Sequence, residues 1–307
     1  MGMADRTPTS AAELKAYETR LSNWGRWGED DERGTLNHIT PEVRQRAAGL
    51  VRSGRSVSCA YPIQTLAVQP NTVRNYRPAD FEVRPIPDGS VDYIGVSYHG
   101  MVNTHIDGFA HMYTDDGLLY NGRSSSLVTP EGAGVMSVHR WADGILTRGV
   151  LYDIPRMRGQ EHLQYGEGIQ GWDLEDCARR NGITPSPGDA VIVRSGAVPF
   201  WERHADLKDS HNTPGLAASV LEFLHDTDAA LLVWDLMEDA DATQTVFPHP
   251  IHRIAIPRMG LPLLDNANLE ALGAACAEEQ RVEFMFTVAP LVVVGGTGSP
   301  VNPIATF

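Results

Sequence analysis

Continuous apolar runs and amphipathic stretches alternate along the chain at uneven intervals. Runs such as Ala190-Val191-Ile192-Val193 are uniformly apolar, which fits strands buried on both faces of a sheet. The pattern places β-like segments at 55–61, 91–98, 149–153, 190–195, 230–235 and 283–294. We expect these segments to form a mixed core sheet.

Two helices are predicted in the first 54 residues, before the first β-like run. Residues 9–22 form the first, with Ser10 as N-cap and Glu13 three residues later, the spacing of a capping box. Thr40-Pro41 opens the second, because proline suits the first helical position, and this helix ends before Gly54. Residues 1–54 are therefore expected to form a helical N-terminal extension.

Further helices are expected between the later strands, near 172–181, 214–227 and 267–278. The polar or proline-rich segments 62–90 and 196–213 are interpreted as loops that could cover a site. No linker divides the chain, so we expect a single α/β domain over residues 1–307, with its sheet flanked by helices.

Composition narrows the range of partners and compartments. A net charge of −14 over 307 residues disfavours nucleic acid and anionic membranes as partners, since both require a basic face. The three cysteines are far apart, which argues against a disulfide framework and suits a reducing cytoplasm. No apolar run reaches membrane-spanning length, and the N-terminus lacks the order of a signal peptide. A cytoplasmic enzyme is expected.

The segment from His99 to His111 carries the most concentrated candidate chemistry. His105 and Asp107 are two residues apart, so on a strand both side chains point to the same face. An imidazole and a carboxylate in that arrangement can hold Zn²⁺, Mn²⁺ or Fe²⁺. His111 follows after the flexible Gly108 and is a candidate third ligand or general base. The alternative is a polar strand end with solvated histidines.

A second cluster lies far downstream, where polar residues follow apolar runs. His252 and Asp265 are candidates to complete the coordination shell or to transfer protons. The alternative is stronger here, because Glu238, Asp239 and Asp241 could form a solvated acidic loop and His249 could lie on the surface. No Gly-x-Ser-x-Gly elbow occurs, so serine hydrolase chemistry lacks its signature.

These residues resemble a known family motif. His105-Ile106-Asp107 with His111 resembles the core of the His-x-Gly-Thr-His-x-Asp-x-Pro-x-His motif of the putative cyclase family, which includes bacterial kynurenine formamidase and isatin hydrolase. The similarity covers most of the chain, with further matching segments at 23–25, 34–37, 120–122, 187–189, 265–270 and 296–300. It implies a swivelling β/β/α fold, a Zn²⁺ or Mn²⁺ site and hydrolysis of an amide or lactone bond.

The resemblance also implies roles for single residues. His105 and Asp107 match metal-ligand positions, and His111 matches the last motif histidine, a ligand or proton carrier. Asp265 falls where relatives carry a glutamate that can bind metal, and His252 falls near a site histidine.

The sequence departs from the motif at three positions. Met101, Asn103 and Phe109 stand where the family has histidine, glycine and proline. His99, two residues before Met101, could substitute for the first histidine through a bulge. Because the first histidine is missing, we expect one metal ion rather than two.

The resulting hypothesis is hydrolysis of a small molecule by metal-activated water, with His111 or His252 carrying the proton. Aromatic and methionine side chains near the site could bind an aromatic or bicyclic substrate or could simply belong to the core: Phe109, Met112, Tyr113, Trp234 and Met237. The alternatives are a metal-dependent lyase or isomerase and a non-catalytic binding protein on the same fold. The resemblance suggests a homodimer or homotetramer.

Overall fold

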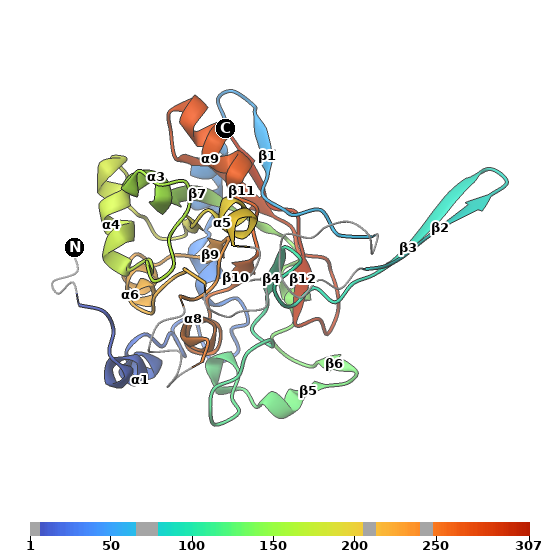
Figure 1. Cartoon of the computed structure of the whole chain (residues 1–307). Helices are drawn as coiled ribbons and strands as arrows, with labels where there is room; N and C mark the ends of the chain where they lie inside the picture. Colours follow the sequence, from blue (N-terminus) through green and yellow to red (C-terminus); the bar gives the residue numbers. More distant parts are fainter. Residues whose placement is uncertain (1–6, 66–78, 205–212, 240–247) are drawn as a thin grey trace.

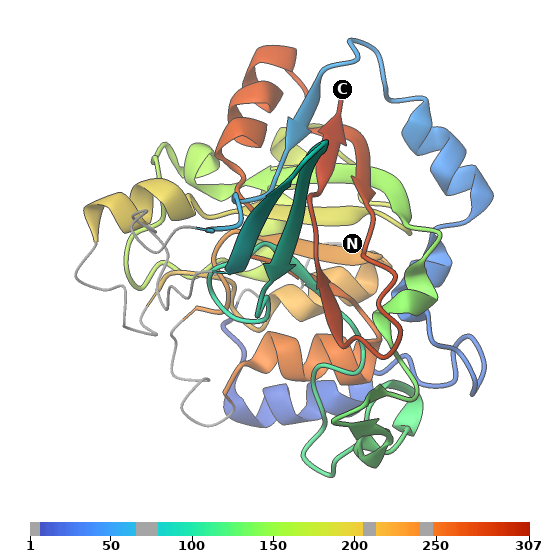
Figure 2. The ribbon, with the colours of Figure 1, turned by 90° about the vertical axis from the view of Figure 1, so that its right-hand side faces the viewer.

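The fold is known from a computed structural model, which describes residues 7–65, 79–204, 213–239 and 248–307. Its centre is a nine-stranded mixed sheet within these ranges, curled like half of a barrel (Figures 1 and 2). The strands in spatial order are β1 (Ser56–Ser58), β13 (Ile304–Thr306), β11 (Glu283–Val288), β7 (Ile145–Asp153), β8 (Ala190–Arg194), β9 (Leu231–Trp234), β10 (Leu263–Asp265), β4 (His105–Asp107) and β12 (Gly298–Pro300). The expected α/β class, with a mixed sheet flanked by helices, is confirmed.

The middle of the sheet is parallel and its two sides are antiparallel. β7, β8, β9 and β10 run parallel to one another. β7 is antiparallel to β11 on one side, and on the other β4 is antiparallel to both β10 and β12. β7 and β8 are mostly or fully buried along their length, as expected for strands covered on both faces. The parallel strands therefore form the centre of the sheet. β4 lies near one edge of the sheet, between β10 and β12.

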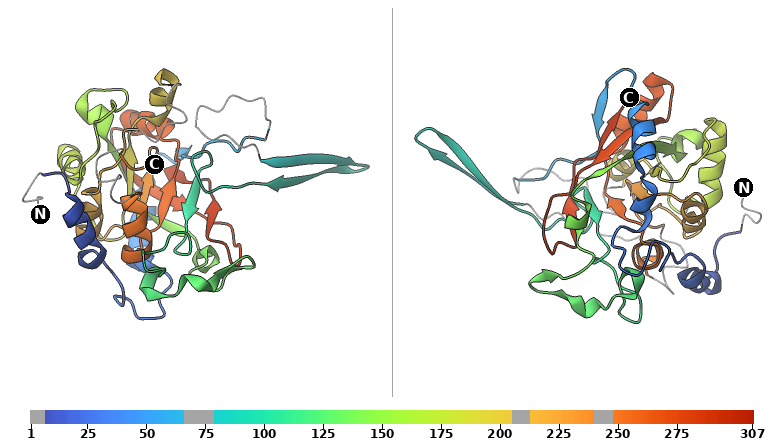
Figure 3. Two further views of the ribbon diagram at one scale, coloured as in Figure 1. Left: turned by 60° about the horizontal axis from the view of Figure 1, so that its bottom comes forward. Right: turned by 180° about the vertical axis from the view of Figure 1, so that it is seen from behind.

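Helices surround the sheet (Figures 1 and 3). Their bounds are α1 (Ala11–Arg20), α2 (Pro41–Ala48), α3 (Ile154–Arg158), α4 (Gly171–Arg180), α5 (Ala197–Arg203), α6 (Val220–Asp226), α8 (Pro250–Ile254) and α9 (Glu270–Glu279). The predicted capping box of α1 is present, since Ser10 and Glu13 exchange hydrogen bonds. Thr40 caps α2, with Pro41 in its first turn. Within the described residues 7–54, helix is confined to α1, α2 and a 3₁₀ turn at Gly34–His38, and residues 21–33 form turns and irregular structure. Leu14, Tyr17 and Leu21 belong to the main core.

Both expected loops contain regular structure. The segment 62–90 includes β2 (Asp80–Ile86), which pairs with β3 (Gly89–Gly95) in a hairpin. The expectation that the run 91–98 joins the core sheet was therefore wrong, because β3 pairs with β2 in a separate two-stranded sheet. Alternation in 80–86 was obscured by Pro85, since proline within a run usually argues against a strand. The segment 196–213 includes α5, and 66–78 and 205–212 lie outside the described residues.

The last predicted β-like run, 283–294, is longer than the strand that the structure shows. The interval 283–294 contributes β11 only up to Val288, and residues 291–294 are exposed.

Two aromatic side chains near the motif, Phe109 and Trp234, are completely buried. Phe109 packs against Tyr120 and Trp141, so it belongs to the core and does not line a binding site.

Within the described part of the chain, no helix has both the length and the apolar character that crossing a membrane requires.

Candidate metal centre

The candidate centre is built on β4, which carries His105 and Asp107 on one face. Their neighbour Ile106 points the other way into the core and is completely buried. Pairing with β10 places Asp265 directly opposite His105, and pairing with β12 places Gly298 opposite Asp107. Two segments separated by more than 150 residues in the sequence thus meet at one point of the sheet.

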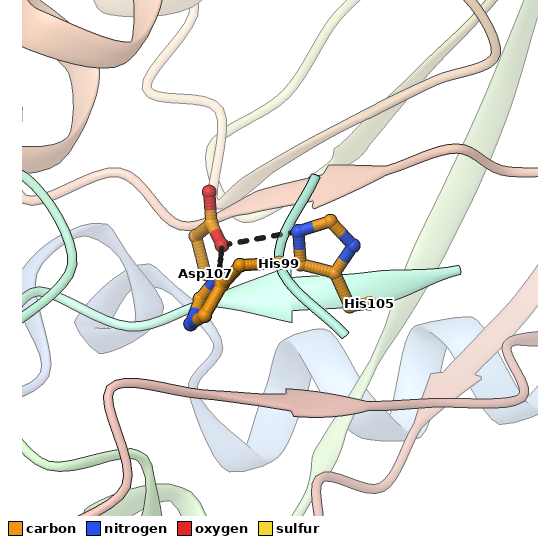
Figure 4. A group of neighbouring side chains, drawn as sticks. All are labelled: His99, His105 and Asp107. Atoms are coloured by element: carbon orange, nitrogen blue, oxygen red, sulfur yellow. Dashed lines mark ion pairs between the residues drawn. The ribbon is translucent and has the colours of Figure 1, made fainter. Parts of the chain in front are cut away.

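His99 joins these residues from the segment that precedes β4 (Figure 4). Its Nδ1 lies 2.8 Å from Asp107 Oδ1, and the Nε2 of His105 lies 3.4 Å from the same oxygen. The three side chains can each offer one ligand atom, and these atoms all lie within 4.8 Å of one another. Two imidazole nitrogens and a carboxylate oxygen therefore converge.

The convergent atoms have no hydrogen bonds of their own. Asp107 is completely buried, yet neither of its carboxylate oxygens has a hydrogen-bond partner, and Nδ1 of His99 also has none. The distance between His99 and Asp107 is short, but their atoms are not aligned for donation. Burying a carboxylate without hydrogen bonds is costly unless a positive charge compensates it. Lone pairs that face a common point satisfy this need when they share a cation, so the donor set fits a divalent metal ion.

The outer hydrogen bonds of both histidines favour this arrangement. Nδ1 of His105 donates to the carbonyl oxygen of Asn103 over 2.8 Å, which leaves the Nε2 lone pair facing Asp107. Nε2 of His99 lies 3.0 Å from the hydroxyl of Thr297, which can accept its proton and leave Nδ1 free. Hydrogen bonds of this kind set the tautomer and ring orientation of metal-binding histidines.

Electrostatics keep the central carboxylate ionised. Burial by itself raises the pKa of Asp107, but the imidazoles of His105 and His99 outweigh burial and hold that pKa far below its ordinary value. Burial lowers the pKa of His105, and Asp107 overcomes burial so that the net pKa is raised. The carboxylate that favours the positively charged imidazole would favour a bound cation for the same reason.

His252 and Asp265 form a second group beside the first. Nε2 of His252 lies 3.1 Å from Asp265 Oδ2, and its Nδ1 lies 2.6 Å from Glu238 Oε1. Burial opposes a charge on His252, but Glu238 and Asp265 raise its pKa well above the ordinary value. Trp234 Nε1 donates to the other oxygen of Asp265 and holds this carboxylate in place.

His111 closes the site on the remaining side. Its ring stacks on that of His99 at a centroid distance of 3.9 Å, and its Nε2 lies 3.6 Å from Asp107 Oδ2. Burial lowers the pKa of His111 to about 4. Its imidazole is therefore neutral at neutral pH and can accept a proton or bind a metal ion.

The structure brings all five sequence-predicted residues together, namely His105, Asp107, His111, His252 and Asp265. It also places His99 and Glu238 at the site. His99, which the sequence offered as a possible substitute for the missing motif histidine, lies beside Asp107. Glu238, for which a solvated loop was the alternative, is buried against His252. The sequence signal for Glu238 was its position just after β9, at the carboxyl edge of the parallel strands.

Comparison with known proteins agrees with this architecture. A family model described as "Putative cyclase" matches residues 38–239, which is more than half of the chain. No curated protein matches the chain. A solved structure described as a novel cyclase has 29% sequence identity and a TM-score of 0.83, covering 94% of this chain and 99% of its own.

Two more distant structures share the fold. Isatin hydrolase A from Labrenzia aggregata has 19% identity and a TM-score of 0.58, covering 88% of this chain and 98% of its own. Isatin hydrolase A from Ralstonia solanacearum has 20% identity and a TM-score of 0.54, covering 85% and 95%. From the family model and the fold together, we conclude that this chain belongs to the putative cyclase family.

Proposed function

We propose that the protein is a metal-dependent hydrolase that opens an amide or lactone bond in a cyclic or aromatic small molecule. The observation that carries the proposal is the fully buried Asp107 carboxylate, which has no hydrogen bond and is faced by imidazole nitrogens of His99 and His105. A bound cation would compensate the negative charge of this buried carboxylate.

His99, His105 and Asp107 would hold one divalent ion, Mn²⁺ or Zn²⁺. Both ions accept imidazole nitrogen together with carboxylate oxygen. Asp265 and His111 could extend this ligand set, because Asp265 Oδ2 lies 4.0 Å from His105 Nε2 and His111 faces the second oxygen of Asp107. When bound, such an ion supplies Lewis-acid activation of water and of a carbonyl group at neutral pH.

The two remaining histidines divide the proton transfers. His111 is neutral at neutral pH and accepts a proton from the attacking water. His252 is held in its protonated form between Glu238 and Asp265, so it donates a proton to the leaving nitrogen or oxygen. No covalent enzyme intermediate is required, in agreement with the missing serine nucleophile motif.

The fold comparisons support the reaction class. Two structures of the same fold are isatin hydrolases, and a third is described as a predicted metal-dependent hydrolase from Bacillus stearothermophilus, with 14% identity and a TM-score of 0.50. At these identities the similarity shows the fold alone. The cleaved bond and the substrate class are therefore part of our proposal.

The test is turnover of cyclic amides, formamides and lactones by metal-stripped protein to which Mn²⁺ or Zn²⁺ is returned. Hydrolysis adds the mass of one water to the substrate, whereas an isomerase leaves the mass unchanged and a dehydratase removes water. A binding protein without activity gives no product. His105→Ala and His111→Ala should be inactive under the same conditions, and full activity in both would refute the proposal.

We also propose that residues 1–307 act as a single domain, assembled as a homodimer or homotetramer in the cytoplasm. Support for the single domain comes from the main core, which includes Leu14 and Tyr17 of α1 as well as Phe307 at the last position. Support for a reducing compartment comes from the three cysteines, which are free and buried.

A further inference from the structure

A cavity of about 580 Å³ is lined by residues of α3, α4 and α9 and by the adjoining ends of β7 and β11. We call it the arginine cavity, for the side chains described below. In the sheet, β8 and β9 separate β7 from β10, which carries Asp265. None of the described residues that line the cavity belongs to the candidate metal centre. Its volume is sufficient for a small organic molecule.

Three arginines from different parts of the chain line this cavity. Arg156 lies in α3, Arg180 is the last residue of α4, and Arg281 follows α9. Two of them lie near the thiol of Cys276, which also lines the cavity. Burial raises the pKa of this thiol to about 12, and the charges of Arg156 and Arg281 act in the opposite direction. Positive charge is thus concentrated here, in a chain whose net charge is −14.

The acidic side chains of the cavity do not neutralise these arginines, because each is paired with another arginine. Asp153 Oδ1 lies 3.0 Å from Nη1 of Arg194, and Glu283 Oε2 lies 3.2 Å from Nη1 of Arg148. Among the described residues, no carboxylate forms an ion pair with any of the three arginines of the cavity. The cavity therefore retains positive charge that an anionic ligand could neutralise.

Arg281 is held in place by contacts that leave part of its guanidinium unused. Its Nη1 donates to the carbonyl oxygen of Leu50 over 2.7 Å, and its guanidinium carbon lies 5.2 Å from the centroid of the Phe307 ring. Its Nη2 is buried and has no hydrogen-bond partner within the described ranges. A buried donor without a partner is unfavourable, and a positioned guanidinium with a spare N–H group suits a carboxylate or phosphate oxygen.

We propose that the arginine cavity binds a small organic anion, whose carboxylate or phosphate groups contact the three arginines. The remaining wall includes apolar side chains that suit a carbon framework, namely Leu151, Met157, Ile183 and Val282. Ligand sites of this size combine such apolar walls with a few polar groups that fix the orientation of the ligand. The proposal concerns a second site and does not depend on the hydrolase activity proposed above.

The experiment is a calorimetric titration of the full chain with two probes, isophthalate and phenyl phosphate. Each probe joins an aromatic ring to oxyanion groups of one kind. Arg156→Gln/Arg180→Gln should weaken binding by about 10-fold or more, because it removes charge-assisted hydrogen bonds. Both side chains are exposed, so this variant should melt at the wild-type temperature. The control Arg84→Gln removes one positive charge from an exposed position in β2 and should bind like the wild type.

His105→Ala separates the arginine cavity from the candidate metal centre, where an anion could also bind to a metal ion. This variant should keep the wild-type affinity for the probes. Binding of isophthalate alone would identify carboxylates as the ligand groups, and binding of phenyl phosphate alone would identify phosphates. No binding of either probe at millimolar concentration would overturn the proposal. Affinity that is lost in His105→Ala and kept in Arg156→Gln/Arg180→Gln would also overturn it.

Discussion

His99 Nδ1 lies 2.8 Å from Asp107 Oδ1, and neither atom makes a hydrogen bond. A separation this short without alignment for donation is expected of two ligands that share a cation. The family motif places its first histidine at position 101, where this chain has a partly buried methionine. His99 reaches the same carboxylate from two residues earlier, so the departure from the motif leaves a histidine beside Asp107.

The first prediction separates these two positions. His99→Ala removes a nitrogen that faces Asp107, so the protein should lose stoichiometric metal. Met101→Ala removes a side chain outside the cluster, so this variant should keep its metal. Elemental analysis of both variants after dialysis checks this, and equal metal contents would contradict the role of His99.

A second prediction concerns Gly298, which faces Asp107 across the β4–β12 ladder. A Cβ atom at this position would lie 2.6 Å from the carbonyl oxygen of Ile106 and 2.7 Å from Cε1 of His99. Gly298→Ala should therefore displace His99, weaken metal binding and cost about 1–3 kcal/mol of stability. Gly89→Ala, where a Cβ meets nothing within 4 Å, is the control and should preserve metal affinity in a calorimetric titration.

Glu238 is expected to act through His252. It is buried and accepts hydrogen bonds from both Nδ1 and the backbone N–H of His252. Glu238→Gln should lower kcat by about 10- to 100-fold, as is typical when a carboxylate that orients a site histidine is lost. It should also narrow the pH range in which the acid form of His252 is present, because the removed charge helps to raise the pKa of His252.

The matched control for Glu238 is His249→Asn. His249 is half-exposed and its Nδ1 lies 3.7 Å from Glu238. Asparagine tolerates the left-handed backbone at this position, where φ is +53°. Unchanged kcat and pH profile are expected in this variant. A loss as large as that of Glu238→Gln, or lower metal content, would show instead that the ion binds at the cluster of Glu238, His249 and His252.

Metal uptake should release protons. Asp107 raises the pKa of His105 in the metal-free protein despite burial. The imidazole must lose its proton before it can bind a metal ion, so affinity should increase as pH rises and fall as pH drops below the pKa of His105. Calorimetric titrations in buffers of different ionisation enthalpy measure the number of protons released. Affinity independent of pH between about 5.5 and 8 would contradict this account.

Phe109 is predicted to stabilise the fold and to play no part in substrate binding. It is completely buried between Tyr120 and Trp141. Phe109→Ala should lower the free energy of unfolding by about 3–5 kcal/mol. Phe109→Leu should retain most of the stability, with KM close to that of the wild type. A large change in KM with unchanged stability would place Phe109 in the binding site after all.

Local patterns predicted much of the fold because they depend on neighbouring residues. The Ser10 capping box, the Thr40-Pro41 helix start and the buried run at 190–194 follow from sequence spacing alone. The short strands β10, β12 and β13 have three residues each, too few for a hydrophobic period to appear. Their pairing is decided by contacts between distant parts of the chain.

In the candidate site, too, local spacing predicted some residues, whereas others depend on contacts between distant parts of the chain. His105 and Asp107 were predictable because a strand places alternate residues on one face. The sequence could not show that Glu238 is buried against His252, because the backbone brings them together across 14 residues that include an undescribed segment. His99 was noted as a possible substitute, but its contact with Asp107 depends on the path of residues 96–104, which no periodic pattern describes.

The most direct measurement is a crystal structure of protein grown with Mn²⁺ or Zn²⁺, with the ion located by its anomalous scattering. We predict one peak about 2.0–2.3 Å from His99 Nδ1, His105 Nε2 and a carboxylate oxygen of Asp107. An ordered structure with no peak among these three side chains, or with the ion beside Glu238 and His249 instead, would contradict the account.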